Sequence, residues 1–150
     1  MPKLNVTNTI TIHATAVKVW DALTNPEQTK KYMFGCEAIS DWKPGSALLW
    51  KGIYEGKEMI FVKGIILEYQ PNKILKFTVI DPHASYPDIP ENHLNVTYEL
   101  MEQNGQTTLT VIQDGFEKAA EGEKRYQDVY NDGKGWDPIL TEIKKVAEAD

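Results

Sequence analysis

The chain has 150 residues, of which 41% are hydrophobic and 25% charged, and its formal net charge at pH 7 is −6. This composition is typical of a soluble globular protein, and the length suits one domain over residues 1–150 that buries its core without disulfides. The negative charge and the single arginine, Arg125, argue against a nucleic-acid partner, whose phosphates require clustered lysines and arginines.

Cysteine usage and hydropathy indicate the compartment. Cys36 is the only cysteine, so no internal disulfide can form, which fits a reducing environment. The first residues, MPKLNVTNT, contain no apolar signal core, and no apolar run reaches the length of a membrane span. We therefore expect a cytoplasmic protein without stable membrane insertion.

The start of the chain predicts one strand followed by two short helices. Apolar and polar residues alternate over residues 4–13, a pattern typical of a half-buried strand. Thr15 suits the N-cap of a helix over residues 16–23, because its hydroxyl can accept a hydrogen bond from the first turn. The Asn-Pro-Glu sequence that follows starts a second short helix, which is expected to end at about residue 33.

From residue 34 onward the sequence predicts strand after strand. Runs of β-branched and aromatic residues are separated by the turn signals KPGS, EGK, QPNK and NG. Strands joined in sequence by short turns make an antiparallel meander. The expected strands cover residues 36–42, 47–54, 58–69, 74–80, 93–102 and 107–114.

One long loop interrupts this meander. Residues 81–92, DPHASYPDIPEN, contain three prolines and three acidic residues. A loop of this length in a compact domain is usually functional or mobile. We expect either a flap over the mouth of a ligand site or a mobile hairpin tip.

The last part of the chain predicts an amphipathic helix. Apolar residues recur at steps of three and four over residues 136–147 and form a stripe that needs a sheet to cover it. Residues 126–130 continue the helical spacing upstream, which would allow one long helix. Gly133, Gly135 and Pro138 oppose continuity, because each glycine weakens a helix by about 1 kcal/mol relative to alanine and proline lacks the backbone donor. Local rules alone therefore place a break near residues 133–136.

The order of the elements resembles the helix-grip fold of the START-like superfamily, which includes polyketide cyclases and Bet v 1-like proteins. Within it, the motifs resemble those of the activator of Hsp90 ATPase homologue 1-like (AHSA1-type) family. Each motif is weak singly, but their order is much more specific and spans nearly the whole chain. The motifs are residues 16–27 (AVKVWDALTNPE), 64–75 (GIILEYQPNKIL) and 113–116 (QDGF), with Gly135, Trp136 and Leu140 further on.

This resemblance implies an α+β fold, in which a curved antiparallel sheet of six to seven strands wraps around a long C-terminal helix. It also implies a cavity between sheet and helix that the two short helices help to close. The Gly-Trp pair lies inside the long helix of this family, so the resemblance favours a bent but continuous helix where local rules favour a break. Relatives bind apolar ligands, some catalyse cyclisation or aromatisation, and one branch contacts a chaperone, so no single activity is implied.

The sequence contains no assembled catalytic or metal-binding set. His13, His83 and His93 lack paired spacing, so we expect no metal site and no cofactor. Cys36 lacks a Cys-His signature that would lower its pKa, and we expect it to pack as a small apolar residue. The carboxylates available for acid–base catalysis mostly adjoin turns, where charged residues are common. They are Asp41, Glu55, Glu58, Glu68 and Asp114.

The aromatic residues are the candidate binding surface. Most fill the core, but a subset is expected to line the cavity, where hydroxyl and N–H groups can meet the polar end of a ligand. Tyr126 and Tyr130 are the candidates for polar contacts, beside space left by Gly133, whereas Ile139 and Leu140 are expected to anchor the helix. The predicted cavity residues are Trp50, Tyr54, Phe61, Phe77, Tyr98, Val111, Tyr126, Tyr130, Gly133 and Trp136.

The leading hypothesis is a non-catalytic protein that binds a small hydrophobic or amphipathic molecule between sheet and helix. A first alternative is a small cyclase, dehydratase or hydrolase that pairs a cavity tyrosine with a carboxylate. A second alternative is a module that interacts with a chaperone or another protein, which would expose an apolar patch outside the cavity.

Overall fold

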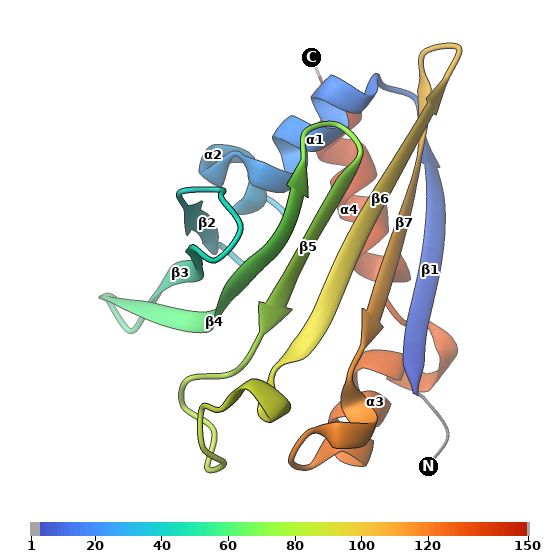
Figure 1. Cartoon of the computed structure of the whole chain (residues 1–150). Coiled ribbons are helices and arrows are strands. Elements are labelled where there is room, and N and C mark those ends of the chain that lie inside the picture. Colours follow the sequence, from blue (N-terminus) through green and yellow to red (C-terminus); the bar gives the residue numbers. More distant parts are fainter. Residues whose placement is uncertain (1–3, 150) are drawn as a thin grey trace.

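The protein consists of a curved antiparallel sheet with helices on its concave side (Figure 1). The structure is a computed structural model that describes residues 4–149. The α+β architecture expected from the sequence is confirmed, with seven strands in one sheet. The strands lie in the order β1-β7-β6-β5-β4-β3-β2, with bounds β1 (Asn5–Ile12), β2 (Glu37–Ser40), β3 (Ala47–Tyr54), β4 (Lys57–Gln70), β5 (Ile74–Val79), β6 (Leu94–Gln103) and β7 (Gln106–Asp114).

The two short helices after β1 begin at the caps that the sequence predicts. The side chain of Thr15 accepts a hydrogen bond from the backbone of Lys18 at the start of α1 (Ala16–Thr24). Asn25 caps α2 (Pro26–Thr29) in the same way. α2 is shorter than predicted, because the chain continues from residue 30 to residue 35 as turns rather than as helix.

The sheet bends where β4 changes partners. β4 pairs with β3 along its first part and with β5 along its last part, and a register shift interrupts each pairing. Gly64 lies near the end of the first part, opposite Leu48, and a Cβ there would sit 1.6 Å from the carbonyl oxygen of Thr78. Only glycine lets the two strands approach this closely, so Gly64 contributes to the curvature that creates a concave side.

The C-terminal helix is broken, so the continuous helix that the resemblance favoured is wrong. Three separate helical pieces replace it, with a left-handed backbone at and just after the end of the first piece. A right-handed helix cannot pass through residues with positive φ, and Pro138 then starts a new helix at its first turn. The pieces are α3 (Gly122–Tyr130), the 3₁₀ turn η3 (Asn131–Gly133) and α4 (Asp137–Glu148).

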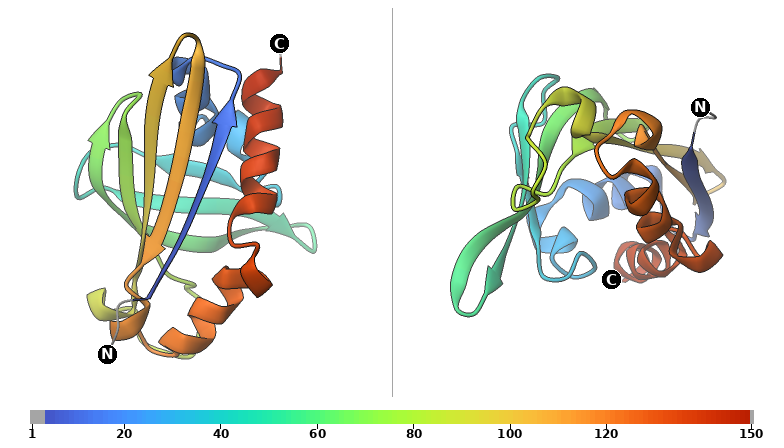
Figure 2. Two further views of the ribbon diagram at one scale, coloured as in Figure 1. Left: turned by 90° about the vertical axis from the view of Figure 1, so that its right-hand side faces the viewer. Right: turned by 90° about the horizontal axis from the view of Figure 1, so that it is seen from below.

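Contacts with β1 hold the break in place. The backbone N–H of Trp136 donates a hydrogen bond to Asn8 Oδ1 at 3.0 Å. A Cβ on Gly135, whose φ is +52°, would lie 2.3 Å from that same oxygen. The chain therefore turns tightly against the strand before α4 begins, and α4 packs on β1 and α1 with Leu140, Ile143 and Ala147 buried (Figure 2).

The long loop between β5 and β6 is attached to the segment around α3. It ends in the 3₁₀ turn η1 (Pro90–Asn92), and the buried Asn92 accepts hydrogen bonds from the backbone of Ala120 at 2.8 Å and from Arg125 at 2.8 Å. The Arg125 guanidinium also lies 4.7 Å from the ring centre of Tyr86. None of the loop residues lines the cavity described below. Within residues 4–149, no helix has both the length and the apolar character needed to cross a membrane.

Candidate functional site

A cavity of about 420 Å³ lies between the concave side of the sheet and the start of α4. Strands β3 to β7 form most of its wall, the turn after α2 forms another part, and the first turn of α4 completes it. Every lining side chain is apolar or aromatic except for Cys36 and Gln113. The lining residues are Met33, Phe34, Cys36, Trp50, Phe61, Val62, Phe77, Val79, Val96, Tyr98, Gln113, Trp136 and Ile139.

Four aromatic rings form a continuous row along the buried wall of this cavity. Trp50 on β3 lies 6.3 Å from Phe77 on β5, measured between ring centres, and Phe77 lies 5.7 Å from Tyr98 on β6. Tyr98 meets the indole of Trp136 edge-on at 6.0 Å, just before α4. Such tilted and edge-to-face pairs are favourable arrangements of aromatic rings. The row fixes the distance between the sheet and α4.

The burial of the lining residues shows where the cavity opens. Its inner wall consists of the four aromatic rings with Cys36, Val96 and Gln113, all buried. Its rim consists of half-buried apolar residues and one fully exposed aromatic residue, Phe34, at 86% exposure. The rim residues come from the turn after α2, from β4, from the end of β5 and from α4. They are Met33, Phe34, Phe61, Val62, Val79 and Ile139.

Two polar groups are buried in the inner wall. The indole N–H of Trp136 donates a hydrogen bond to Gln113 Oε1 at 2.9 Å, which holds both side chains in place. The hydroxyl of Tyr98 is buried and has no hydrogen-bond partner among the described residues. A buried polar group without a partner is unfavourable and calls for an explanation. The Tyr98 ring lines the cavity, but its hydroxyl is closed off behind the wall, where it is unpaired among the described residues.

Burial keeps the ionisable groups of the lining neutral. It raises the pKa of Tyr98 well above its usual value and also raises the pKa of the Cys36 thiol. Because the thiolate is the reactive form of cysteine, Cys36 is poorly suited to nucleophilic catalysis. Among the lining residues there is no Asp, Glu, His, Lys or Arg, so the cavity wall supplies no carboxylate for an acid–base pair.

Comparison with known proteins identifies the family. The family model described as activator of Hsp90 ATPase homolog 1-like protein matches residues 13–148. The chain belongs to this family. The resemblance drawn from the sequence motifs is thereby confirmed. No curated protein matches the chain significantly.

Solved structures share the START-like helix-grip fold of this AHSA1-type chain. The solution structure of ChR145 from Cytophaga hutchinsonii is 36% identical, with a TM-score of 0.73 over 99% of this chain and 97% of that one. The crystal structure of NE0264 from Nitrosomonas europaea is 20% identical, with a TM-score of 0.70 over 95% and 93%. The solution structure of the Aha1 dimer from Colwellia psychrerythraea is 18% identical, with a TM-score of 0.67 over 97% and 96%.

Half of the cavity residues predicted from the sequence lie around this space in the AHSA1-type domain. They are Trp50, Phe61, Phe77, Tyr98 and Trp136. All but Trp136 lie on strands, where alternation indicates which side chains point inward.

The other predicted residues lie away from the cavity. Tyr54 is 56% exposed at the tip of the β3–β4 hairpin, and Val111 is fully buried in the core on β7. Tyr126 packs against Phe116 and stacks on Tyr130, which is 42% exposed. Gly133 is exposed beside Tyr130. The break before α4 explains the last three placements, because it separates α3 from the helix that faces the sheet.

Sequence reasoning missed several lining residues. Val96 and Gln113 share the inward parity of Tyr98 and Val111, so alternation alone could have found them. Met33, Phe34 and Cys36 lie in a turn whose position depends on tertiary contacts, and no periodic signal marks them.

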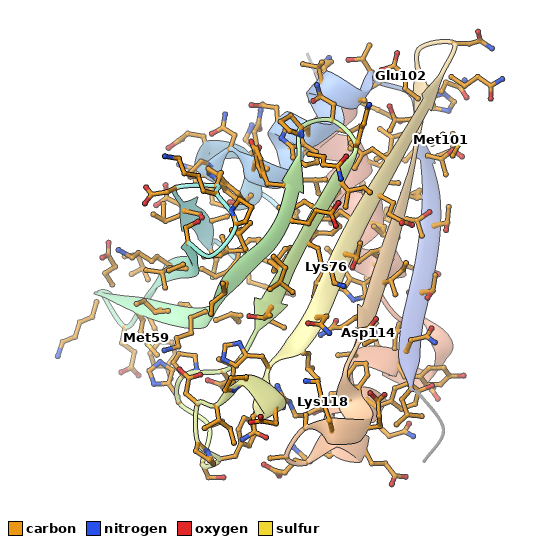
Figure 3. The ribbon with its side chains drawn as sticks, viewed as in Figure 1. Met59, Lys76, Met101, Glu102, Asp114 and Lys118 are labelled. Carbon is orange, nitrogen blue, oxygen red and sulfur yellow. The ribbon has the colours of Figure 1, made fainter. Side chains whose placement is uncertain are left out.

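The histidines and candidate carboxylates lie outside the cavity. His93 contacts Asp88 through Nε2 at 2.6 Å and Thr78 through Nδ1 at 2.7 Å, on the outer side of the sheet. Asp114 accepts a hydrogen bond from Asn95 at 3.0 Å, at the lower end of β7 (Figure 3). In the described part of the chain, no group of three or more His, Cys, Asp or Glu residues is arranged to hold a metal ion.

Proposed function

We propose that the protein binds a small hydrophobic or amphipathic molecule in the cavity between the sheet and α4. The observation that carries this proposal is the cavity itself, whose volume of about 420 Å³ lies within the range of small-molecule sites. Its lining of aromatic and aliphatic side chains suits an apolar molecule, because burying apolar surface is the main driving force for such binding.

The Tyr98 hydroxyl lies behind the inner wall, and an amphipathic ligand would reach it only if the wall opened. It is the one buried side-chain polar atom without a partner among the described residues. A ligand oxygen or nitrogen that pairs with it would remove an unfavourable feature of the empty site. Its raised pKa keeps this hydroxyl protonated at neutral pH, so it can donate as well as accept.

The four tryptophans allow a test with an internal control. Trp50 and Trp136 line the cavity, whereas Trp20 and Trp42 pack on Tyr69 outside it. In a two-dimensional NMR titration with lipids, flavonoids and polyketides, a ligand should shift the indole N–H signals of the first pair. The signals of the second pair should stay in place. Native mass spectrometry of freshly purified protein would identify a ligand that copurifies.

Two results would contradict this function. One is that no compound of the panel shifts an NMR signal of the inner wall. The other is a set of shifts confined to Trp20, Trp42 and exposed amides, which would indicate surface adsorption. The enzyme alternative requires a carboxylate near a cavity tyrosine, and no carboxylate lies in the lining, so the arrangement favours binding over acid–base catalysis.

A second candidate function is protein interaction through the outer side of the sheet. Ile39, Ile65 and Leu67 are 38%, 43% and 44% exposed. Ile39 on β2 lies opposite Leu49 of β3, and Ile65 on β4 lies opposite Ala47 of β3, so the exposed residues flank β3 on that face. Exposed apolar clusters of this kind are typical of interaction sites. One family member is named for activating the ATPase of Hsp90, so an Hsp90-type chaperone is the partner to test.

Charge substitution tests this second candidate. Ile65→Lys and Leu67→Lys should abolish capture of the protein by an immobilised Hsp90-type chaperone. Met101→Lys is the control, because Met101 is 74% exposed on β6, far from this face of β2–β4 (Figure 3). Equal capture of all three variants, or no capture of the unmodified protein, would refute the interaction.

A further inference from the structure

Phe34 combines two features that are unfavourable in the protein as it stands. Its side chain is 86% exposed to solvent. Its φ is +53°, and that of the following Gly35 is +81°. Bulky residues rarely adopt a left-handed backbone, whereas glycine and asparagine do so readily. Neither burial of the ring nor backbone preference accounts for a phenylalanine at this position.

The turn that carries Phe34 is firmly held on both sides. Before it, Tyr32 is buried and its hydroxyl donates to the carbonyl oxygen of Ala22 at 2.9 Å. After it, the backbone N–H of the buried Cys36 donates to the carbonyl oxygen of Met33 at 2.9 Å and closes the turn. The ring of Phe34 is therefore presented at a fixed place rather than at the end of a loose loop.

That place is the rim of the cavity. Phe34 lines the cavity together with Met33, Phe61, Val62 and Ile139, and none of these rim residues is polar. The hydroxyl without a partner belongs to Tyr98 on the inner wall instead. A molecule in the cavity would therefore meet only apolar side chains at its outer end.

Resting on the proposed function, we propose that Phe34 is a ligand-contacting residue that closes the cavity mouth over the apolar or aromatic outer end of the bound molecule. Burial of the ring against the ligand would give the exposed side chain the contacts it lacks. Strained residues at ligand clamps are a recognised use of unfavourable backbone geometry. The ligand class that follows carries an apolar or aromatic group at its outer end.

The test measures binding of N-phenyl-1-naphthylamine, a neutral probe with one N–H group and aromatic ends, by its fluorescence. Phe34→Ala should weaken the probe Kd about 10-fold, mainly through faster dissociation, because part of the burial of one aromatic ring is lost. Phe34→Leu should retain most of the affinity. Met101→Ala, which removes an equally exposed apolar side chain on β6, should bind within about 2-fold of the unmodified protein.

A variant that fills the cavity separates failure of this inference from failure of the proposed function. Val79 is a half-buried rim residue at the end of β5, and Val79→Phe should abolish probe binding by occupying the space. If the unmodified protein does not bind the probe, or Val79→Phe binds it equally well, the proposed function fails and this inference with it.

Two other results overturn the role of Phe34 alone. The first is Phe34→Ala binding with unchanged affinity while Val79→Phe does not bind. The second is Phe34→Ala losing adsorption to phosphatidylcholine vesicles with no change in probe affinity, which would assign the ring to a lipid surface. Thermal unfolding of Phe34→Ala should match that of the unmodified protein, because the ring is exposed.

Discussion

At the scale of single residues, two buried tyrosines differ in one hydrogen bond. Tyr32 is 5% exposed and donates its hydroxyl to the carbonyl oxygen of Ala22. Tyr98 is 1% exposed and its hydroxyl has no partner within residues 4–149. Burial raises the pKa of both, so both hydroxyls stay protonated. Only Tyr32 therefore stabilises the protein through its hydroxyl, whereas that of Tyr98 is buried without a partner among the described residues.

Removing each hydroxyl should consequently have opposite effects. Tyr32→Phe should lower the free energy of unfolding by about 1 kcal/mol, the net value of one hydrogen bond. Tyr98→Phe should leave that free energy unchanged or raise it by up to about 1 kcal/mol, because an unsatisfied buried group disappears. The same substitution should weaken binding of a ligand that has a hydrogen-bonding end. Urea unfolding and ligand titration measure the two quantities, and a Tyr98→Phe variant as destabilised as Tyr32→Phe would contradict this account.

At the scale of elements, the sheet was predictable because its signal is local. Alternation and turn residues located strands β3 to β7 to within about two residues, and inward parity found the cavity residues Trp50, Phe77 and Tyr98. Of the rim residues, Phe61 was predicted, whereas Met33 and Phe34 were not, because their turn is placed by the contacts of Tyr32 and Cys36. At the C-terminus, local glycine and proline rules were right where the family resemblance was wrong, since Asn8 holds the break that they indicate.

The break divides the C-terminal segment into two elements with different roles. α4 buries Leu140, Ile143 and Ala147 against β1 and α1. In α3, only Gly122 is buried. Most of the stability contributed by this segment should therefore come from α4.

Truncations on the two helices test this division. Leu140→Ala should lower the free energy of unfolding by about 2–5 kcal/mol, because Leu140 is fully buried and the variant leaves a void in the core. Tyr130→Ala should cost less than about 1 kcal/mol, because Tyr130 is exposed and only its stacking on Tyr126 is lost. Chemical denaturation compares the two, and equal losses would mean that α3 contributes to the core as much as α4.

At the scale of the whole molecule, the end of α4 is tied to the connection between β1 and α1. Glu148 Oε2 accepts hydrogen bonds from Lys144 Nζ at 2.5 Å and from the backbone N–H of His13 at 2.8 Å. Lys144 Nζ also donates to the carbonyl oxygen of Thr11 at 3.0 Å. These contacts join the last helix to the first strand at the end of the molecule away from α3, so they close the helix-grip fold on that side.

The charge of Glu148 makes this closure sensitive to acid. The hydrogen bond from Lys144, followed by that from His13, lowers the pKa of Glu148 below its usual 4.5. Because the folded pKa is lower than the unfolded one, the carboxylate stabilises the fold above about pH 4.5, and this contribution disappears as the pH falls through the folded pKa. Glu148→Gln should lower the free energy of unfolding at pH 7 by at most about 1 kcal/mol, since the pair is partly exposed.

Unfolding measured across a pH series separates this contribution from general acid denaturation. The difference between the unmodified protein and Glu148→Gln should shrink toward zero as the pH falls from 4.5 through the lower folded pKa of Glu148, below which that side chain is neutral like glutamine. Glu142→Gln is the matched control, because within residues 4–149 the Glu142 carboxylate pairs with Lys145 on the same helix and makes no hydrogen bond to β1. If both variants lost the same free energy of unfolding at pH 7, the negative charge on α4 would contribute to stability, but the contact of Glu148 with β1 and the following residues would not. A difference confined to Glu148→Gln would instead locate the effect in the contact that joins the two ends of the fold.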